Sequence, residues 1–246
     1  MNLMKTTNLA YEKTVDERVP EKMRIIQVHT NENLLKERAM LEYPVVFEDK
    51  PVYSKFKRFG DVIGSIGALT VLSPVFLAAM VAIIIDDFGN PFYSQTRIGK
   101  NGKHFKIYKF RSMYKNADQR REELLKKNES KGATFKIKND PRITKVGAFL
   151  RKTSIDELPQ LVNILKGDMS FVGPRPFIPS EQENLPPDRL LVEPGLSCYW
   201  QISGKNDLPL AEQIALDRKY IQERSVKTDI KIVFKTILHV LSGKNY

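Results

Sequence analysis

The stretch from Val62 to Ile85 contains 24 consecutive residues without a charged side chain. A helix needs about 20 predominantly apolar residues to cross the hydrocarbon core of a bilayer, and buried helices of soluble proteins rarely stay uncharged for so long. The stretch therefore predicts a membrane helix and argues against the core helix of a soluble protein.

A break within this stretch, and the residues on either side of it, indicate how the helix meets the membrane. Ser73 and Pro74 lie at its midpoint, where proline removes a backbone donor and a serine hydroxyl can bond a freed carbonyl. Both flanks are basic, and the positive-inside tendency draws both to the cytoplasmic face. A re-entrant helix is therefore favoured, with an ordinary kinked transmembrane helix as the alternative. The basic residues are Lys55, Lys57 and Arg58 before the stretch and Arg97, Lys100, Lys103, Lys106 and Lys109 after it.

Composition divides the chain into three parts. Residues 1–52 form a polar extension that lacks the features of a secretory signal, and residues 53–90 hold the membrane helix. Residues 91–246 alternate short strand and helix patterns, and the 41% hydrophobic content of the chain is enough to bury a core. We expect extended segments at 91–95 and 103–111 and helices at 116–130, 158–165, 207–224 and 229–241. The last helix is basic and amphipathic, and suits either a membrane surface or packing on the core.

The charge balance points to an anionic partner. Lys and Arg outnumber Asp and Glu by 40 to 29, a formal net charge of +11, which attracts phosphorylated substrates, anionic lipid or nucleic acid without choosing among them. A single cysteine, Cys198, excludes an internal disulfide framework and fits a reducing, cytoplasm-facing location. With three histidines there is no Cys/His cluster at zinc spacing.

Two adjacent carboxylates, Asp156 and Glu157, stand where an apolar helix begins in a strongly cationic stretch. The spacing of Ser154 and Glu157 is that of a capping box, which would make Glu157 a structural residue. Pro159 would then fall at the fifth helical position, where a backbone donor is wanted. A helix that begins later, with both carboxylates at its positive end, is the alternative, and there the macrodipole would favour their ionised form and a nearby phosphate.

The two carboxylates need separate roles, because adjacent helical side chains point about 100° apart and cannot share a proton. One is suited to attack a phosphorus atom, and the other to hold Mg²⁺ against a diphosphate. Both Asp156 and Glu157 are candidate metal ligands. The candidate clamps for phosphate oxygens are Lys109, Arg111, Arg142, Arg151 and Arg175.

These motifs, taken together and in order, resemble those of monotopic phosphoglycosyl transferases, the bacterial sugar transferase family that begins capsule, exopolysaccharide and glycoprotein glycan assembly. The resemblance covers about residues 55 to 246. It rests on Lys57-Arg58, Ser73-Pro74, Gln95-Thr-Arg-Ile-Gly99, Lys109-Phe-Arg-Ser-Met113, Asp140-Pro-Arg142, the run from Arg151 to Gln160, Gly173-Pro-Arg-Pro176, Pro194-Gly-Leu196 and Trp200-Gln-Ile-Ser-Gly204.

The resemblance implies a small mixed α/β domain at the cytoplasmic face of the bacterial inner membrane, with a re-entrant, non-spanning helix and surface amphipathic helices. It also implies that Asp156 attacks the β-phosphate of a UDP-sugar, releasing UMP, and that polyprenyl phosphate then accepts the phosphosugar. Glu157 would bind Mg²⁺, Arg151 and Arg175 would hold phosphate, and Asp217 matches a further acidic position near the site. The resemblance favours glucose or galactose as the transferred sugar.

Rival interpretations remain. Asp156 could act as a general base in a direct, single displacement, or the chain could be a basic membrane-anchored binding protein in which the carboxylates only cap a helix. The enzyme interpretation expects no nucleic acid partner. Residues 1–52 depart from the family pattern, and pairing with a partner subunit or a second copy, as in a homodimer, is a hypothesis for their role.

Overall fold

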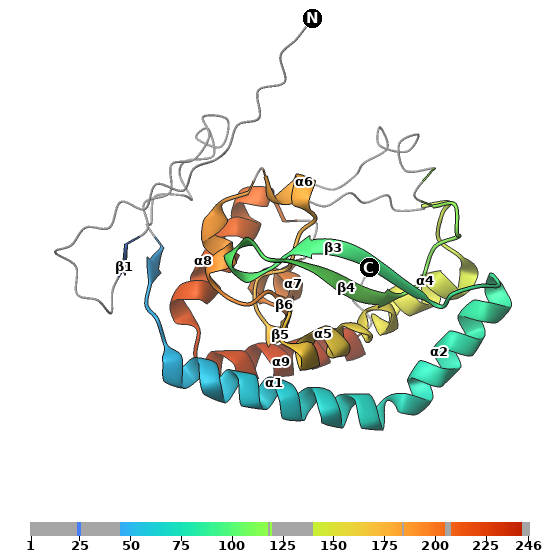
Figure 1. Cartoon of the computed structure of the whole chain (residues 1–246), viewed down its shortest axis with the longest axis horizontal. Helices are drawn as coiled ribbons and strands as arrows, with labels where there is room; N and C mark the ends of the chain where they lie inside the picture. The colour runs from blue at the N-terminus through green and yellow to red at the C-terminus, as the bar shows by residue number, and fades with distance from the viewer. Residues whose placement is uncertain are drawn as a thin grey trace, which may run out of the picture.

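The computed structural model describes residues 24–25, 45–117, 119, 140–183, 185–204 and 208–242. Within these residues helices and short strands alternate along the chain, which confirms a small mixed α/β domain (Figure 1). The helix predicted at 116–130 lies almost wholly outside the described residues, as does most of the extension at 1–52. From that extension the structure describes one short antiparallel pair, β1 (Arg24–Ile25) with β2 (Val46–Phe47).

The predicted membrane helix consists of two helices, α1 (Pro51–Val71) and α2 (Ser73–Asp86), which meet at Leu72. Pro74 lies in the first turn of α2, where its missing N–H leaves no helical bond unmade. The Ser73 hydroxyl donates to the Thr70 carbonyl at 2.8 Å, as expected for a freed carbonyl. In the described part of the chain no helix on its own has the length and hydropathy of a bilayer span, whereas α1 and α2 pass that test as a pair bent by 61°.

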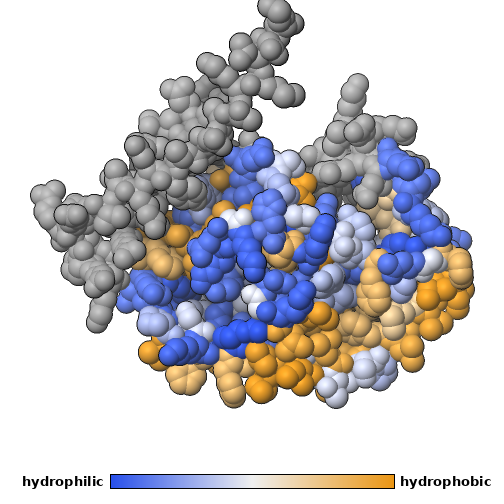
Figure 2. Space-filling model, in the orientation of Figure 1, coloured by the Kyte–Doolittle hydropathy of each residue, from blue (hydrophilic) through white to orange (hydrophobic). Residues whose placement is uncertain are grey.

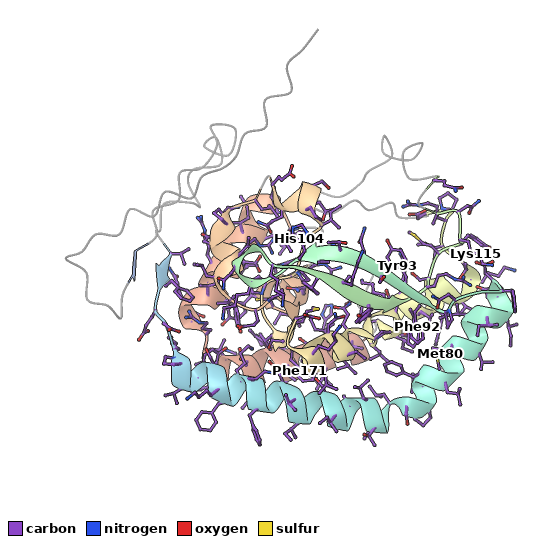
Figure 3. All side chains as sticks on the ribbon, in the orientation of Figure 1. Met80, Phe92, Tyr93, His104, Lys115 and Phe171 are labelled. Atoms are coloured by element: carbon purple, nitrogen blue, oxygen red, sulfur yellow. The ribbon has the colours of Figure 1, made fainter. Side chains whose placement is uncertain are left out.

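One face of α1 is fastened to the protein body. Asp61 accepts hydrogen bonds from the Ser170 hydroxyl at 3.0 Å and the Phe171 backbone N–H at 3.1 Å. Gly64 faces the Phe171 ring so closely that a Cβ would lie 2.8 Å from it, and Phe171 lies beside α1 in Figure 3. The opposite face exposes large apolar side chains, and Figure 2 shows apolar residues gathered along the edge that α1 and α2 form. On α1 they include Val52, Phe56, Phe59, Ile63 and Ile66.

A hairpin of β3 (Phe92–Ile98) and β4 (His104–Phe110) packs on α1, α2 and α5. Its turn, Lys100–Gly102, holds Asn101 in the left-handed region at φ 56°. Phe110 lies in the core with Ala79 and Ile83 of α2, and its ring stacks on Phe92 with 5.5 Å between centroids. The strands predicted at 91–95 and 103–111 are thereby confirmed.

The second half of the chain folds over a parallel strand pair, β5 (Ser170–Val172) with β6 (Gly195–Ser197). The remaining long helices are α8 (Leu210–Glu223) and α9 (Val226–Leu241), which confirm the two helices predicted near the C-terminus. The shorter helical elements are α4 (Lys145–Lys152), η4 (Ile155–Glu157), α5 (Gln160–Lys166), α6 (Pro179–Gln182), η5 (Pro187–Leu191) and α7 (Tyr199–Ser203).

Helix α9 packs on the core through one face, which confirms one of the two arrangements that its sequence allowed. Ile232 is fully buried in the core with Tyr220 and Ile221 of α8. The opposite face is exposed and apolar, and α9 lies beside α1 (Figure 1). The exposed side chains are Val226, Ile230, Phe234, Ile237 and Leu238.

Candidate active site

The chain around the two carboxylates makes a tight turn rather than a helix start. Ser154 has φ 58° and ψ 16°, a left-handed conformation that non-glycine residues rarely adopt, and its side chain caps nothing. Asp156 and Glu157 follow in the single 3₁₀ turn η4, and the regular helix α5 begins only at Gln160. The capping-box interpretation is therefore wrong, and the later helix start is confirmed, with Pro159 at the N-cap.

Glu157 is held by two cations from distant parts of the chain. Lys109, near the end of β4, donates to Glu157 Oε1 at 2.7 Å. Arg175, in the loop after β5, places its NH1 3.5 Å from the same oxygen. Three elements that lie far apart in the sequence thus meet at one carboxylate.

Asp156 is buried, with 8% of its surface exposed, and its pKa is raised to about 6. Burial is the main cause, and the charge of Glu157 adds to it, whereas Lys109, Arg151 and Arg175 oppose it. We expected the helix macrodipole to favour the ionised form, but loss of solvent outweighs the cations and raises the pKa instead. Asp156 is still ionised at neutral pH, and an ionised carboxylate with a raised pKa is a stronger nucleophile than an ordinary one.

Arg151 reaches the site because α4 is pressed against the end of β4. Its Nε donates to the Ser112 hydroxyl at 2.8 Å, and Ser112 is buried. The Ser112 carbonyl lies so near Gly147 of α4 that a Cβ on Gly147 would fall 2.0 Å from it. The Thr144 hydroxyl caps α4 by accepting from the Gly147 N–H at 2.9 Å. This close packing fixes where the Arg151 guanidinium lies.

Three of the predicted site residues have their contacts elsewhere. Arg111 binds Asp87 at the end of α2, through the backbone carbonyl and with 3.5 Å to Oδ2. Arg142 is buried and binds the Asp140 carboxylate, at 2.9 Å from Nε and 2.6 Å from NH2. Asp217 is buried and accepts from Arg189 at 2.7 Å. The structure therefore gives Arg111, Arg142 and Asp217 protein partners other than the carboxylate pair.

The predicted membrane-entry residues also contact the protein. Lys57 binds Asp229 of α9 at 2.7 Å. Arg58 donates from both terminal nitrogens to the carbonyls of Ile164 and Leu165, each at 2.6 Å, and so completes the C-terminal end of α5. Their cationic groups join α1 to α9 and to α5.

Arg97 lies in this neighbourhood, and its sequence context predicted a basic flank of the apolar stretch rather than a site residue. It is mostly buried on β3, donates to Gln95 Oε1 at 2.7 Å and lies 3.7 Å from Glu181 of α6. Burial and, after it, the charge of Arg175 lower its pKa to about 10, so the two guanidinium groups are near each other. The signal was present in Gln95-Thr-Arg-Ile-Gly99, a motif of the resemblance.

The donor set suits a magnesium ion that is shared with a substrate. Within the described residues no three Asp, Glu, His or Cys side chains gather into a possible metal site. Mg²⁺ commonly binds one or two carboxylates and completes its octahedron with water and substrate phosphates. The Asp156–Glu157 pair fits that pattern and does not fit a site built from protein groups alone.

Comparison with known proteins decides the family. The model of the bacterial sugar transferase family matches residues 52–243, from the start of α1 to the end of α9. The chain belongs to the bacterial sugar transferase family. This confirms the resemblance drawn from the motifs.

Several relatives share more than two fifths of their aligned residues with this chain. The exopolysaccharide production protein ExoY of Rhizobium meliloti is 46% identical over 195 residues, which cover 76% of this chain and 86% of the relative. The galactosyl transferase CpsE of Streptococcus agalactiae is 47% identical over 191 residues, covering 76% and 42%. The undecaprenyl-phosphate galactose phosphotransferase of Salmonella typhimurium is 43% identical over 192 residues, covering 75% and 40%. The last two bacterial sugar transferases are thus more than twice as long as the segment they share with this chain.

Proposed function

We propose that this chain transfers a phosphosugar from a UDP-sugar to undecaprenyl phosphate, as a phosphoglycosyl transferase in exopolysaccharide or capsule assembly. Membership of the family and the names of the relatives support the reaction class. The observation that carries the proposal is the burial of one carboxylate, Asp156, among the charges of Lys109, Arg151 and Arg175. Such a group can attack phosphorus while the cations hold the phosphate oxygens.

In the first step a carboxylate oxygen of Asp156 attacks the β-phosphorus of the UDP-sugar. The bond from that phosphorus to the bridging oxygen breaks, and UMP leaves with the electron pair. The negative charge that builds on the non-bridging oxygens faces Arg151 and Arg175, which are suited to bidentate contact, and Lys109. Because the pKa of Asp156, about 6, is still below neutral pH, the carboxylate is ionised there, as a nucleophile must be.

In the second step an oxygen of undecaprenyl phosphate attacks the phosphorus of the aspartyl-phosphosugar. The bond between that phosphorus and Asp156 breaks, and the carboxylate is restored. A lipid acceptor presents its phosphate at the bilayer surface. The connection of α4 to α2, through the Val146 N–H and Asp86 at 3.0 Å, supports a site close to that surface.

Mg²⁺ belongs to the proposal with Glu157 and Asp156 as its ligands. When bound, the ion would neutralise part of the diphosphate charge and orient the departing phosphate. In the structure Glu157 contacts Lys109 and Arg175, the same cations that we propose for the substrate phosphates.

The membrane arrangement that we propose is re-entrant, with the catalytic domain on the cytoplasmic face of the inner membrane. The bend of 61° between α1 and α2 supports it, as do the exposed apolar faces of α1 and α9, which lie beside each other. A homodimer through residues 1–52 stays a prediction, since most of that extension is outside the described residues.

Exchange of UMP tests the covalent route. Protein in nanodiscs is incubated with radiolabelled UMP, Mg²⁺ and each of several UDP-sugars, without undecaprenyl phosphate. Label should enter one UDP-sugar with the parent chain and none with Asp156→Asn, which also identifies the sugar. Asp168→Asn is the control, because Asp168 lies at the other end of α5, where its carboxylate is 3.9 Å from Lys166.

Two outcomes would replace the proposal. Lipid transfer without any exchange would favour direct displacement, with Asp156 as general base. Neither transfer nor exchange, together with unchanged lipid binding by Asp156→Asn, would favour a membrane-anchored binding protein.

A further inference from the structure

The loop that carries Arg175 is fixed by its backbone. It follows β5 as Gly173-Pro-Arg-Pro176, and the N–H of Gly195 donates to the Pro174 carbonyl at 3.0 Å. A Cβ on Gly195 would fall 2.0 Å from the Gly173 nitrogen, so the loop and β6 are in direct contact. These contacts hold the loop at Gly173 and Pro174. The position of the Arg175 side chain depends further on the contact that the Arg175 carbonyl makes.

That peptide group is bound by a buried arginine. Arg189 of η5 donates from NH2 to the Arg175 carbonyl at 2.9 Å and, from the same nitrogen, to Asp217 Oδ2 at 2.7 Å. Its guanidinium lies 4.1 Å from the centre of the Phe177 ring, two residues after Arg175. Both Arg189 and Asp217 are at least 95% buried. Asp217 thus orients the Arg189 guanidinium, which binds the backbone of the Arg175 loop.

We propose that Arg189 and Asp217 are positioning residues, which hold the Arg175 loop so that the Arg175 guanidinium faces Glu157 and the phosphates of the substrate. The inference rests on the proposed function. It replaces the prediction that Asp217 binds the substrate, because a buried carboxylate that already accepts from Arg189 is a poor contact for a phosphate.

The energetics support a positioning role over a purely stabilising one. A buried ion pair loses so much hydration that it adds little net stability compared with apolar side chains of the same size. What it supplies is direction, since the two N–H bonds of one planar guanidinium nitrogen point at fixed angles to the two acceptors. Here the two acceptors are a helix carboxylate and the carbonyl of a residue at the site.

A neighbouring ion pair provides a matched control. Arg218 of α8 donates to Asp188 of η5 at 2.6 Å, and each of these residues adjoins one member of the proposed pair. This ion pair joins the same two elements, η5 and α8, and is similarly buried. Its hydrogen bond is to the Asp188 carboxylate and not to the Arg175 loop. A change there reports what loss of an η5–α8 ion pair does to the fold alone.

The test is a double-mutant cycle on UMP exchange. Arg189→Lys keeps the charge but loses the planar guanidinium with its fixed N–H directions, and is measured in the parent and in Arg175→Ala. Arg218→Lys is measured in the same two backgrounds. We expect Arg189→Lys to lower kcat/KM about 10-fold in the parent and less than about 3-fold in Arg175→Ala, since a residue that acts through Arg175 has nothing left to position. Arg218→Lys should have the same factor in both. Affinity for UMP, measured on the same variants, should follow the same pattern.

The outcomes separate the two levels of the argument. Equal factors for Arg189→Lys in both backgrounds, in an active parent, would overturn the positioning role and leave the proposed function standing. A parent that neither exchanges nor transfers with any UDP-sugar would overturn the proposed function and this inference with it. Asp217→Asn keeps the shape of the side chain and serves as the second variant, with the same expected non-additivity. Melting temperatures of all variants identify any that fail to fold.

Discussion

Asp86, the last residue of α2, accepts a 3.0 Å hydrogen bond from the backbone N–H of Val146, the second residue of α4. The next N–H, of Gly147, donates to Thr144, the helix's own cap. A helix leaves its first N–H groups without internal partners, and here Asp86 of α2 satisfies one of them. Since α4 carries Arg151 and leads directly into the turn of Asp156, the position of α2 is connected to the catalytic groups.

Removal of this cap should affect both stability and turnover. Asp86→Ala loses the acceptor and should lower the free energy of unfolding by about 1 kcal/mol, the usual cost of a helix cap. Asp86→Asn keeps an oxygen at the same place and should stay close to the parent. Melting temperature and UMP exchange in nanodiscs measure the two effects. Equal losses in both variants would mean that the charge of Asp86, and not its hydrogen bond, stabilises α4.

The contact of α4 with β4 gives a steric prediction. In Gly147→Ala the new methyl group would overlap the Ser112 carbonyl, so α4 must shift and draw Arg151 from its bond with Ser112. We expect a loss of about 1–3 kcal/mol in stability and a larger loss in exchange than the stability change explains. Gly60→Ala in α1 meets nothing within 4 Å and serves as control, with equal or higher stability. An active, stable Gly147→Ala would contradict the tight packing.

Features that depend on neighbours in the sequence were predictable. The uncharged stretch and its Ser73-Pro74 break specify a bent helix by local physics alone, because length and a missing backbone donor need no tertiary partner. The amphipathic pattern of α9 likewise anticipates its buried and exposed faces. Pro159 correctly delayed the start of α5.

Features set by contacts between distant segments were not predictable from the sequence. In Lys109-Phe-Arg-Ser-Met113, adjacent side chains diverge, so that Lys109 meets Glu157, Arg111 meets Asp87 and Ser112 meets Arg151. A sequence motif names these residues together but does not say that two of them contact Glu157 and Arg151 whereas the third binds Asp87. The raised pKa of Asp156 is of the same kind, because burial is a property of the whole fold.

Asp156 should make the protein less stable as the pH rises. Its pKa is raised from 3.8 to about 6, so the folded state holds the proton more tightly than the unfolded state, and stability falls between about pH 4 and pH 6. The full shift corresponds to at most about 3 kcal/mol. Asp156→Asn does not titrate, so its melting temperature relative to the parent should rise over this range and stay constant above it.

Asp140 provides the control of opposite sign. Burial raises its pKa, but hydrogen bonds from Arg142 outweigh burial and hold the pKa below its usual value. Asp140 therefore stabilises the fold above about pH 4 and loses this effect in acid. Asp140→Asn should melt below the parent at pH 7 and approach it as the pH falls below about 4. Parallel pH profiles for the two variants would contradict the assigned shifts.

The re-entrant arrangement predicts which residues are reached from each side of the membrane. Helix α2 has 14 residues and is about 21 Å long, shorter than the roughly 30 Å hydrocarbon core, so it cannot cross alone. Lys55, near the start of α1, and Lys103, after α2, are both exposed, and the sole cysteine of the chain, Cys198, is buried. Lys55→Cys and Lys103→Cys should therefore both react with an impermeant maleimide added to the cytoplasmic face, and neither from outside. Val71→Cys, beside the bend and 76% exposed, should be protected in membranes and react in detergent. Labelling of Lys55→Cys and Lys103→Cys from opposite faces would instead establish a kinked transmembrane span.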